Sequence, residues 1–147
     1  MATLDPDSLA KLGTCEPVLA NIIIAVAAHC PFGFRVTDAA RTVEKQQEAF
    51  DTGHSKVNPK SFATPALLYA AAKHVTGPGA PLSRAVDVAI VGRDPYNVPQ
   101  LAYLAGMIKI EAARRSVKVR WGGDFDRDGA LLEPGTFQDT PHHELDQ

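Results

Sequence analysis

The stretch Ala85–Val91 (AVDVAIV) constrains the fold more than any other part of this chain. Its residues are apolar and mostly β-branched, so they predict a strand that is buried on both faces in the interior of a sheet. Asp87 is the only charged residue of the stretch. Because an isolated buried carboxylate is too costly, Asp87 needs a partner, which could be backbone N–H groups, an arginine such as Arg84, or a metal ion.

Helical and strand patterns are mixed along the rest of the chain without regular βαβ alternation. The patterns predict helices from Pro17 to the stop at Pro31 and over Thr42–Asp51, Pro65–Val75 and Asn97–Arg115, with further strands over Phe32–Thr37 and Val117–Trp121. The remainder, Gly122–Gln147, is loop-rich. This mixture favours an α+β fold with a small, largely antiparallel sheet and flanking helices.

The chain of 147 residues has the usual size of one domain, so we expect a single domain over residues 1–147. Its formal net charge of −2 and the lack of a dense Lys/Arg run argue against a nucleic-acid-binding protein. The most apolar stretch, Val18–Cys30, is too short and too polar for a membrane span. No signal peptide is visible at the N-terminus, and the two cysteines, Cys15 and Cys30, are expected to be free and buried.

The C-terminal segment contains a cluster of possible metal ligands, Asp139-x-x-His142-His143-Glu144. If the segment is extended, His142 and His143 point to opposite faces, so only one of them can join a given site. Asp139 could curl to the same side as His142. Taken alone, such a cluster is more often a polar tail than a site, so it needs support from elsewhere in the sequence.

That support comes from six short motifs and their order along the chain. They are Ala40–Gln46 (ARTVEKQ), Gly53–Lys56 (GHSK), Lys73–Gly77 (KHVTG), Ala85–Asp87 (AVD), Trp121–Asp124 (WGGD) and Asp139–Leu145 (DTPHHEL). In this order they resemble the zinc peptidases of the D-alanyl-D-alanine carboxypeptidase family, and in particular its phage endolysin branch, the L-alanyl-D-glutamate peptidases. The resemblance runs from about Ser8 to the C-terminus and implies the fold of DD-peptidases and Hedgehog proteins.

The resemblance also implies a metal site. One Zn²⁺ would be bound by His74, Asp87 and His142, with a further position open to water. Two neutral imidazoles and one carboxylate leave the metal with a net positive charge, which would lower the pKa of a bound water to ~7 and polarise a peptide carbonyl.

Three further residues match positions with roles in the family. Asp139 corresponds to the general base, which would take a proton from water and pass it to the leaving amine. Arg41 corresponds to an arginine that binds carbonyl or developing oxyanion charge, for which its fixed fork of donors is suited. Gln46 corresponds to a residue that supports the site, and His143 is expected to be a neighbour of the site.

The spacing of the first ligand departs from the family pattern, H-x-x-G-x-A-x-D. If the KHVTG motif is the true match, Pro78–Arg84 is an insertion that loops out and returns, as its Pro and Gly content permits. If the short spacing is kept instead, the ligand position is occupied by Ala80 and the zinc site is incomplete. We favour His74, because four of the five residues of its motif match the endolysin form.

A second acidic segment, Asp124-Phe-Asp126-Arg-Asp128-Gly129, begins like a calcium-binding loop. An EF-hand loop would have Glu at its twelfth position, where this chain has Gly135, so a true EF-hand is excluded. An Asp/Gly-rich turn is the favoured interpretation, and a looser Ca²⁺ site is kept as a hypothesis.

The function expected from the resemblance is a zinc metallopeptidase that hydrolyses the stem peptides of bacterial peptidoglycan, between L-alanine and D-glutamate. A D-alanyl-D-alanine carboxypeptidase or dipeptidase is the alternative enzyme, and a cell-wall-binding module that has lost a zinc ligand is the alternative without catalysis. We expect a monomer that binds neither nucleic acid nor membrane. Such a phage lysin would accumulate in the host cytoplasm and reach the wall after release.

Overall fold

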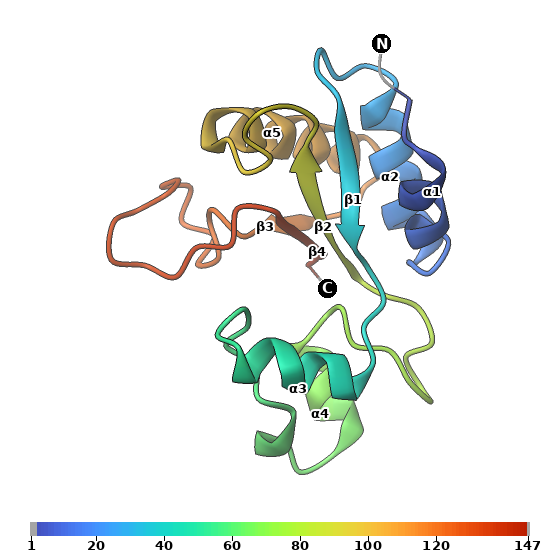
Figure 1. Ribbon diagram of the computed structural model, residues 1–147, viewed down its shortest axis with the longest axis vertical. Helices are drawn as coiled ribbons and strands as arrows, with labels where there is room; N and C mark the ends of the chain where they lie inside the picture. The colour runs from blue at the N-terminus through green and yellow to red at the C-terminus, as the bar shows by residue number, and fades with distance from the viewer. Residues whose placement is uncertain (1–2, 147) are drawn as a thin grey trace.

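The computed structural model, which describes residues 3–146, contains one antiparallel sheet with the strand order β1-β2-β4-β3 (Figure 1). Its strands are β1 (Phe34–Asp38), β2 (Ala85–Ile90), β3 (Val119–Trp121) and β4 (His142–Leu145). β2 lies between β1 and β4 and is buried at every position except Asp87, as its apolar sequence predicts. The predicted α+β class with a small antiparallel sheet is therefore confirmed.

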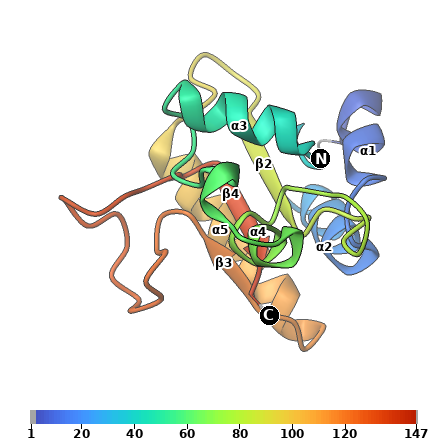
Figure 2. The ribbon, with the colours of Figure 1, turned by 90° about the horizontal axis from the view of Figure 1, so that it is seen from below.

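The helices divide into two groups on different sides of the sheet (Figures 1 and 2). The first group is α1 (Pro6–Leu12), α2 (Pro17–Ala27) and α5 (Val98–Arg114), and the second is α3 (Val43–Asp51), the 3₁₀ helix η1 (Pro59–Ser61) and α4 (Pro65–Ala71). The first group packs on the sheet around the main hydrophobic core. The second group forms a lobe with a smaller core of its own around Leu68 and Val75.

Alternation along the strands separates an apolar face from a polar face. Val86 and Val88 of β2 and Leu145 of β4 belong to the main core. Since successive side chains of a strand point to opposite faces, Asp87 and His142 lie on the other side. The sheet therefore presents its polar residues away from α1, α2 and α5.

Local signals in the sequence set the beginnings of the helices. Thr42 and Thr64 cap α3 and α4 by accepting hydrogen bonds from Lys45 N and Leu67 N, and Asn97 caps α5 in the same way. Apart from the helix predicted over Pro65–Val75, the predicted helices and strands are present, with ends shifted by up to three residues. Helix α1 was not predicted. No helix within residues 3–146 is long and apolar enough to cross a membrane, and both cysteines are buried and free, as expected.

One prediction about local structure is wrong and one strand was not predicted, and both concern the site. The helix predicted over Pro65–Val75 ends at Ala71, because Val75 forms a parallel bridge with Arg41 instead of continuing the helix. The loop-rich C-terminal segment ends in a strand that was not predicted, β4, which pairs with both β2 and β3. In each case pairing with a distant segment decides the conformation.

Candidate active site

Three side chains from distant parts of the chain converge on one point. They are His74, which follows α4, Asp87 of β2 and His142 of β4. His74 Nε2 lies 3.1 Å from Asp87 Oδ1 and 3.1 Å from His142 Nδ1, and His142 Nδ1 lies 3.1 Å from Asp87 Oδ1. Ligand atoms at about 2.0–2.1 Å from a tetrahedral zinc are roughly 3.3 Å apart, so this triangle has the size that a zinc ion requires.

The backbone explains why these three residues meet. Asp87 and His142 are direct partners in the register of β2 and β4, so their side chains share one face. The segment of His74 is held beside Arg41, because Arg41 N donates to His74 O at 2.8 Å and Thr76 N donates to Arg41 O at 3.0 Å. The geometry of the His74–Asp87–His142 cluster thus depends on one strand pair and one parallel bridge.

The residues that make the spacing between His74 and Asp87 longer than in the family pattern form a loop that leaves the site and returns. Gly77 and Ala80 exchange two backbone hydrogen bonds of 2.9 and 3.0 Å, which close the loop at its base. Ala80 packs against the small core of the α3–α4 lobe and does not belong to the converging cluster. The structure thus brings His74, and not position 80, to Asp87 and His142.

The outer nitrogens of both imidazoles are held by acceptors. His74 Nδ1 lies 2.7 Å from Ala39 O, and His142 Nε2 lies 2.9 Å from Glu144 Oε1. A carbonyl or carboxylate oxygen only accepts, so these nitrogens carry the hydrogens. In neutral rings the lone pairs of His74 Nε2 and His142 Nδ1 then point at Asp87 Oδ1. Such a convergence of acceptors repels unless a proton or a metal cation lies among them, and held outer nitrogens of this kind are typical of metal-binding histidines.

The electrostatics of the cluster agree with a site for a cation. Burial alone raises the pKa of Asp87, but the charge and hydrogen bonds of the two histidines hold that pKa well below its usual range. Burial alone lowers the pKa of His142, but hydrogen bonds with Asp87 and Glu144 outweigh it and raise the pKa to about 9. The cluster therefore strongly favours positive charge at its centre.

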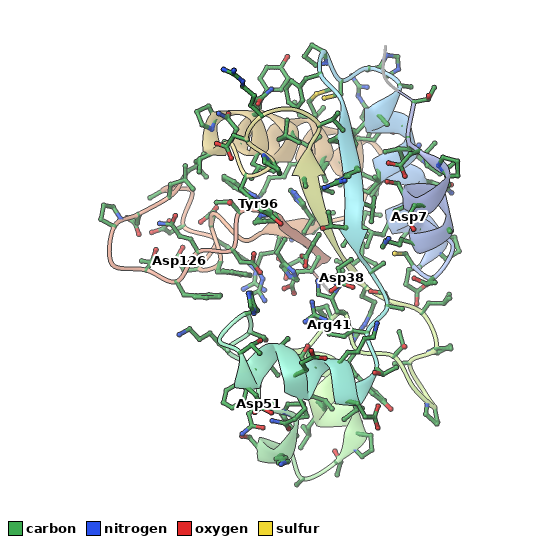
Figure 3. The ribbon with its side chains drawn as sticks, in the orientation of Figure 1. Asp7, Asp38, Arg41, Asp51, Tyr96 and Asp126 are labelled. Carbon is green, nitrogen blue, oxygen red and sulfur yellow. The ribbon has the colours of Figure 1, made fainter. Side chains whose placement is uncertain are left out.

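Arg41 lies between the sheet and α3, next to Asp38 (Figure 3). Its Nε and Nη2 donate to Asp38 Oδ2, its Nη1 donates to Gln46 Oε1 at 2.8 Å, and Nη2 lies 3.8 Å from Asp87 Oδ2. Asp38 is the partner of Asp87 in the register of β1 and β2, so Arg41 separates two carboxylates that would otherwise repel. Arg84, suggested as a partner of Asp87, instead donates to the backbone oxygen of Tyr69.

The buried amide of Gln46 links Arg41 to the loop after α3. Its Nε2 donates to Ser55 Oγ at 2.8 Å and to Val57 O at 2.9 Å. Gln46 is only 1% exposed, and all of these bonds stay within the protein. It thus fixes the position of Arg41 relative to the residues on either side of Lys56.

Asp139 is brought towards the cluster by the glycines that follow Trp121. Asp139 N donates to Gly122 O at 2.8 Å, and a Cβ at Gly122 would lie 1.8 Å from Asp139 O, so only glycine permits this approach. Trp121 Nε1 donates to Thr140 O at 2.8 Å and holds the same segment. Burial, followed by the charge of Asp87, raises the pKa of Asp139, whose carboxylate has no hydrogen-bond partner within residues 3–146.

The two residues that follow His142 in β4 lie on opposite faces of the sheet, and the role of Glu144 was not predicted. Glu144 lies two positions along β4, on the same face, and its two oxygens bind His142 Nε2 and Arg120 Nη2 at 2.9 and 3.1 Å. His143, predicted to neighbour the site, lies on the core face between Val86 and Trp121. It is fully buried, and neither ring nitrogen has a hydrogen-bond partner in the described part of the chain.

A cavity of about 570 Å³ opens over the cluster between the sheet, the α3–α4 lobe and the loop that follows β3. Its walls include four basic residues, Arg41, Lys56, Lys73 and Arg120, and the carboxylates Asp87, Asp139 and Glu144. Phe125 and Phe137 line the cavity on the side of the loop and stack with ring centres 5.6 Å apart. The cavity thus offers a substrate both charged and apolar contacts next to the candidate ligands.

The second acidic segment, Asp124, Asp126 and Asp128, also forms a cluster, in which one carboxylate oxygen of each residue lies within 4.8 Å of the others. Asp126 and Asp128 are exposed, and their carboxylates accept backbone hydrogen bonds from Asp128 N and Ala130 N. Those bonds are typical of an Asp-rich turn. Asp124 is buried, and its Oδ1 has no partner among residues 3–146.

Comparisons with known proteins agree with this geometry. The sequence model of a family described as phage L-alanyl-D-glutamate peptidase matches residues 2–146. Among solved structures, the fold is similar to that of the L-Ala D-Glu endopeptidase ChiX of Serratia marcescens, with a TM-score of 0.69 and 22% sequence identity over 96% of this chain and 87% of that chain. No curated protein matches the sequence. The resemblance inferred from the six motifs is therefore confirmed.

Proposed function

Since this chain belongs to the phage L-alanyl-D-glutamate peptidase family, and so is a peptidoglycan peptidase, we propose that it is a zinc-dependent endopeptidase. Its substrate would be the stem peptide of bacterial peptidoglycan, cut between L-alanine and D-glutamate. The enzyme would act on the wall after release from the host cytoplasm. A wall-lytic phage enzyme needs no membrane span and no nucleic-acid contact.

The observation that carries the proposal is the convergence of His74 Nε2, Asp87 Oδ1 and His142 Nδ1 at 3.1 Å from one another. The donor set of two imidazoles and one carboxylate is one that zinc accepts in catalytic sites, where a fourth position stays open. A zinc ion bound there would lower the pKa of a bound water to ~7 and polarise the carbonyl of the peptide to be cut.

Asp139 would act as the general base. It lies close enough to the cluster that Asp87, His142 and His74 all influence its pKa, and its carboxylate is free of other hydrogen bonds within residues 3–146. An ionised Asp139 would take a proton from the attacking water and deliver it to the nitrogen of the leaving D-glutamate. The close approach at Gly122 would keep the carboxylate in place for both transfers.

Arg41 would bind the oxygen of the carbonyl under attack. Its guanidinium uses Nε and one hydrogen on each terminal nitrogen to bind Asp38 and Gln46. One further hydrogen on each terminal nitrogen remains for a ligand in the cavity. Because Asp38 and Gln46 fix the guanidinium in advance, no reorganisation is needed as negative charge develops on the oxygen.

The test is to incubate the protein with a defined stem peptide and identify the products by mass spectrometry. We expect a fragment with a new free amine on D-glutamate, no cleavage after treatment with a chelator, and normal cleavage by a control variant, Asp126→Asn. Release of D-alanine would instead favour the carboxypeptidase. Binding of peptidoglycan without zinc or cleavage would favour a wall-binding module and would refute the proposal.

A further inference from the structure

The proposed substrate has a carboxylate next to the bond that is cut. D-glutamate has one amine and two carboxyl groups; the amine forms the bond to L-alanine and one carboxyl continues the stem. The other carboxyl remains free, within a few bonds of the nitrogen that leaves. An enzyme that cuts this bond must therefore accommodate a negative charge beside its metal centre, and the inference that follows rests on the proposed function.

The two arginines of the cavity are already committed to other groups. Arg41 binds Asp38 and Gln46. Arg120 donates to Glu144 Oε2 at 3.1 Å and to Phe125 O at 3.3 Å. In the proposed function the remaining hydrogens of Arg41 bind the carbonyl oxygen under attack, and the Nε of Arg120, which has no partner within residues 3–146, is buried out of reach of a ligand. The binding of a substrate carboxylate therefore falls to the two lysines.

Lys56 lines the cavity and contacts its aromatic pair. Its Nζ is 5.5 Å from the centre of the Phe137 ring, Phe137 stacks on Phe125, and Phe125 is the ring that lies against His142, with centres 5.8 Å apart. The ammonium of Lys56 thus already has the face of an aromatic ring as its partner. It is less available to a substrate carboxylate than an ammonium without such a partner.

Lys73 is the residue directly before the candidate ligand His74, and it is among the residues that line the cavity. It is partly buried, and no carboxylate of residues 3–146 lies within 4.0 Å of its ammonium. The charges of Glu144 and Asp146 reach Lys73, but neither carboxylate is in direct contact with it. The charges of Arg84 and Arg120 reach it as well. A partly buried ammonium without a carboxylate in direct contact is unfavourable, and a carboxylate ligand would reduce that cost. Lys73 is therefore the cavity cation that is available to an anionic substrate.

We propose that Lys73 binds the free carboxylate of the D-glutamate residue on the leaving side of the scissile bond, and that it makes the enzyme selective for stems in which this group is ionised. Stems whose D-glutamate carries a carboxamide at the same position would bind less well, because an ammonium cannot form an ion pair with a neutral amide. Lys73 is a specificity residue in this assignment, and the bond-breaking steps do not involve it.

The experiment compares kcat/KM on two synthetic stem peptides that differ only in this group, carboxylate or carboxamide. The wild type should prefer the carboxylate by roughly 10- to 100-fold, the range of a hydrogen bond to a charged group. Lys73→Met should lower kcat/KM for the carboxylate peptide by that factor and leave the carboxamide peptide nearly unchanged. Lys73→Arg, which keeps the charge, should recover part of the preference.

Lys56→Met is the matched control, because it removes the cavity lysine that contacts the aromatic pair and should leave the ratio between the two peptides unchanged. Zinc content should be the same in all variants. An equal loss on both peptides in Lys73→Met, or an unchanged ratio, would overturn the role of Lys73 while the proposed function stands. Failure of the wild type to cut either peptide would refute the proposed function and this inference with it.

Discussion

The two neighbouring histidines of β4 lie on opposite faces of the sheet, and their surroundings differ. His142 faces the cavity, where Asp87 and Glu144 bind its two nitrogens and raise its pKa to about 9. His143 faces the main core, where it has no hydrogen-bond partner within residues 3–146 and burial lowers its pKa to about 3. Both are buried, so burial alone does not distinguish them. The hydrogen-bond partners on each face therefore decide whether a buried histidine can serve as a metal ligand or only destabilises the fold.

The largest effect of a change on the cavity face should come from Asp139→Asn. The amide keeps the size of the side chain but cannot take up a proton, so kcat should fall by about 10²- to 10⁴-fold. Zinc content and thermal stability should remain those of the wild type, because Asp139 is not one of the three converging ligands. Retention of full kcat would assign the proton transfers to another group.

A smaller effect, on zinc affinity, is expected from Glu144→Gln. This change removes the negative charge that binds His142 Nε2, the ring nitrogen that points away from the cluster. Outer partners of metal-bound histidines typically contribute 10–100-fold to metal affinity, so zinc should bind more weakly by a factor in that range. Competition with a chromogenic chelator measures this affinity directly. Asp146→Asn, which alters an exposed ion pair with Arg127 just after the end of β4, is the control and should leave zinc affinity unchanged.

On the core face, His143→Leu should stabilise the protein and leave cleavage intact. Removing an unsatisfied buried polar ring should raise the free energy of unfolding by about 1–3 kcal/mol. The pKa of His143 is lowered from 6.5 to about 3 by burial, so below pH 6.5 the unfolded chain takes up a proton that the folded protein does not. Wild-type stability should therefore fall as pH drops from 6.5 towards 3.

The difference in the free energy of unfolding between His143→Leu and the wild type should grow by about 1.4 kcal/mol for each pH unit below pH 6.5. Urea denaturation of both proteins between pH 7 and 4 measures it. His142→Leu is the matched change on the other face, and it should abolish zinc binding. A stability gap that does not depend on pH would show that His143 already has a partner.

The smallest effect concerns the acidic cluster after β3. Calcium normally takes six to eight oxygen ligands, and here only three carboxylates are close, two of them exposed. We expect weak binding, so that 10 mM Ca²⁺ adds on the order of 1 kcal/mol to stability and raises Tm by roughly 2–4 °C. Asp126→Asn should remove the rise. No shift in the wild type would leave the segment as a turn without a metal.

The sequence predicted the parts of the fold whose signals are local. The apolar run of β2, the amphipathic pattern of α5 and the fold class were all correct. The end of α4 and the strand β4 were missed, because the Arg41–Val75 bridge and the pairing of β4 depend on contacts between distant segments. Periodicity within one segment does not contain that information.

The candidate site shows the same limit. The order of the motifs led to His74, Asp87 and His142, which the structure brings together, although nothing local placed His74 beside Asp87. Glu144 could have been found, since positions 142 and 144 of an extended segment share a face. Asp38 could not, because its position opposite Asp87 depends on the register of β1 and β2, which includes a shift near Val36.

The central claim is that a zinc ion held by His74, Asp87 and His142 is needed for cleavage. The most direct measurement is a zinc titration of the metal-free protein, with bound metal and stem-peptide cleavage followed together. The account predicts that both rise in parallel and level off at about one zinc per chain, and that His142→Leu shows neither. Full cleavage by protein without zinc, or a saturated zinc site in His142→Leu, would contradict it.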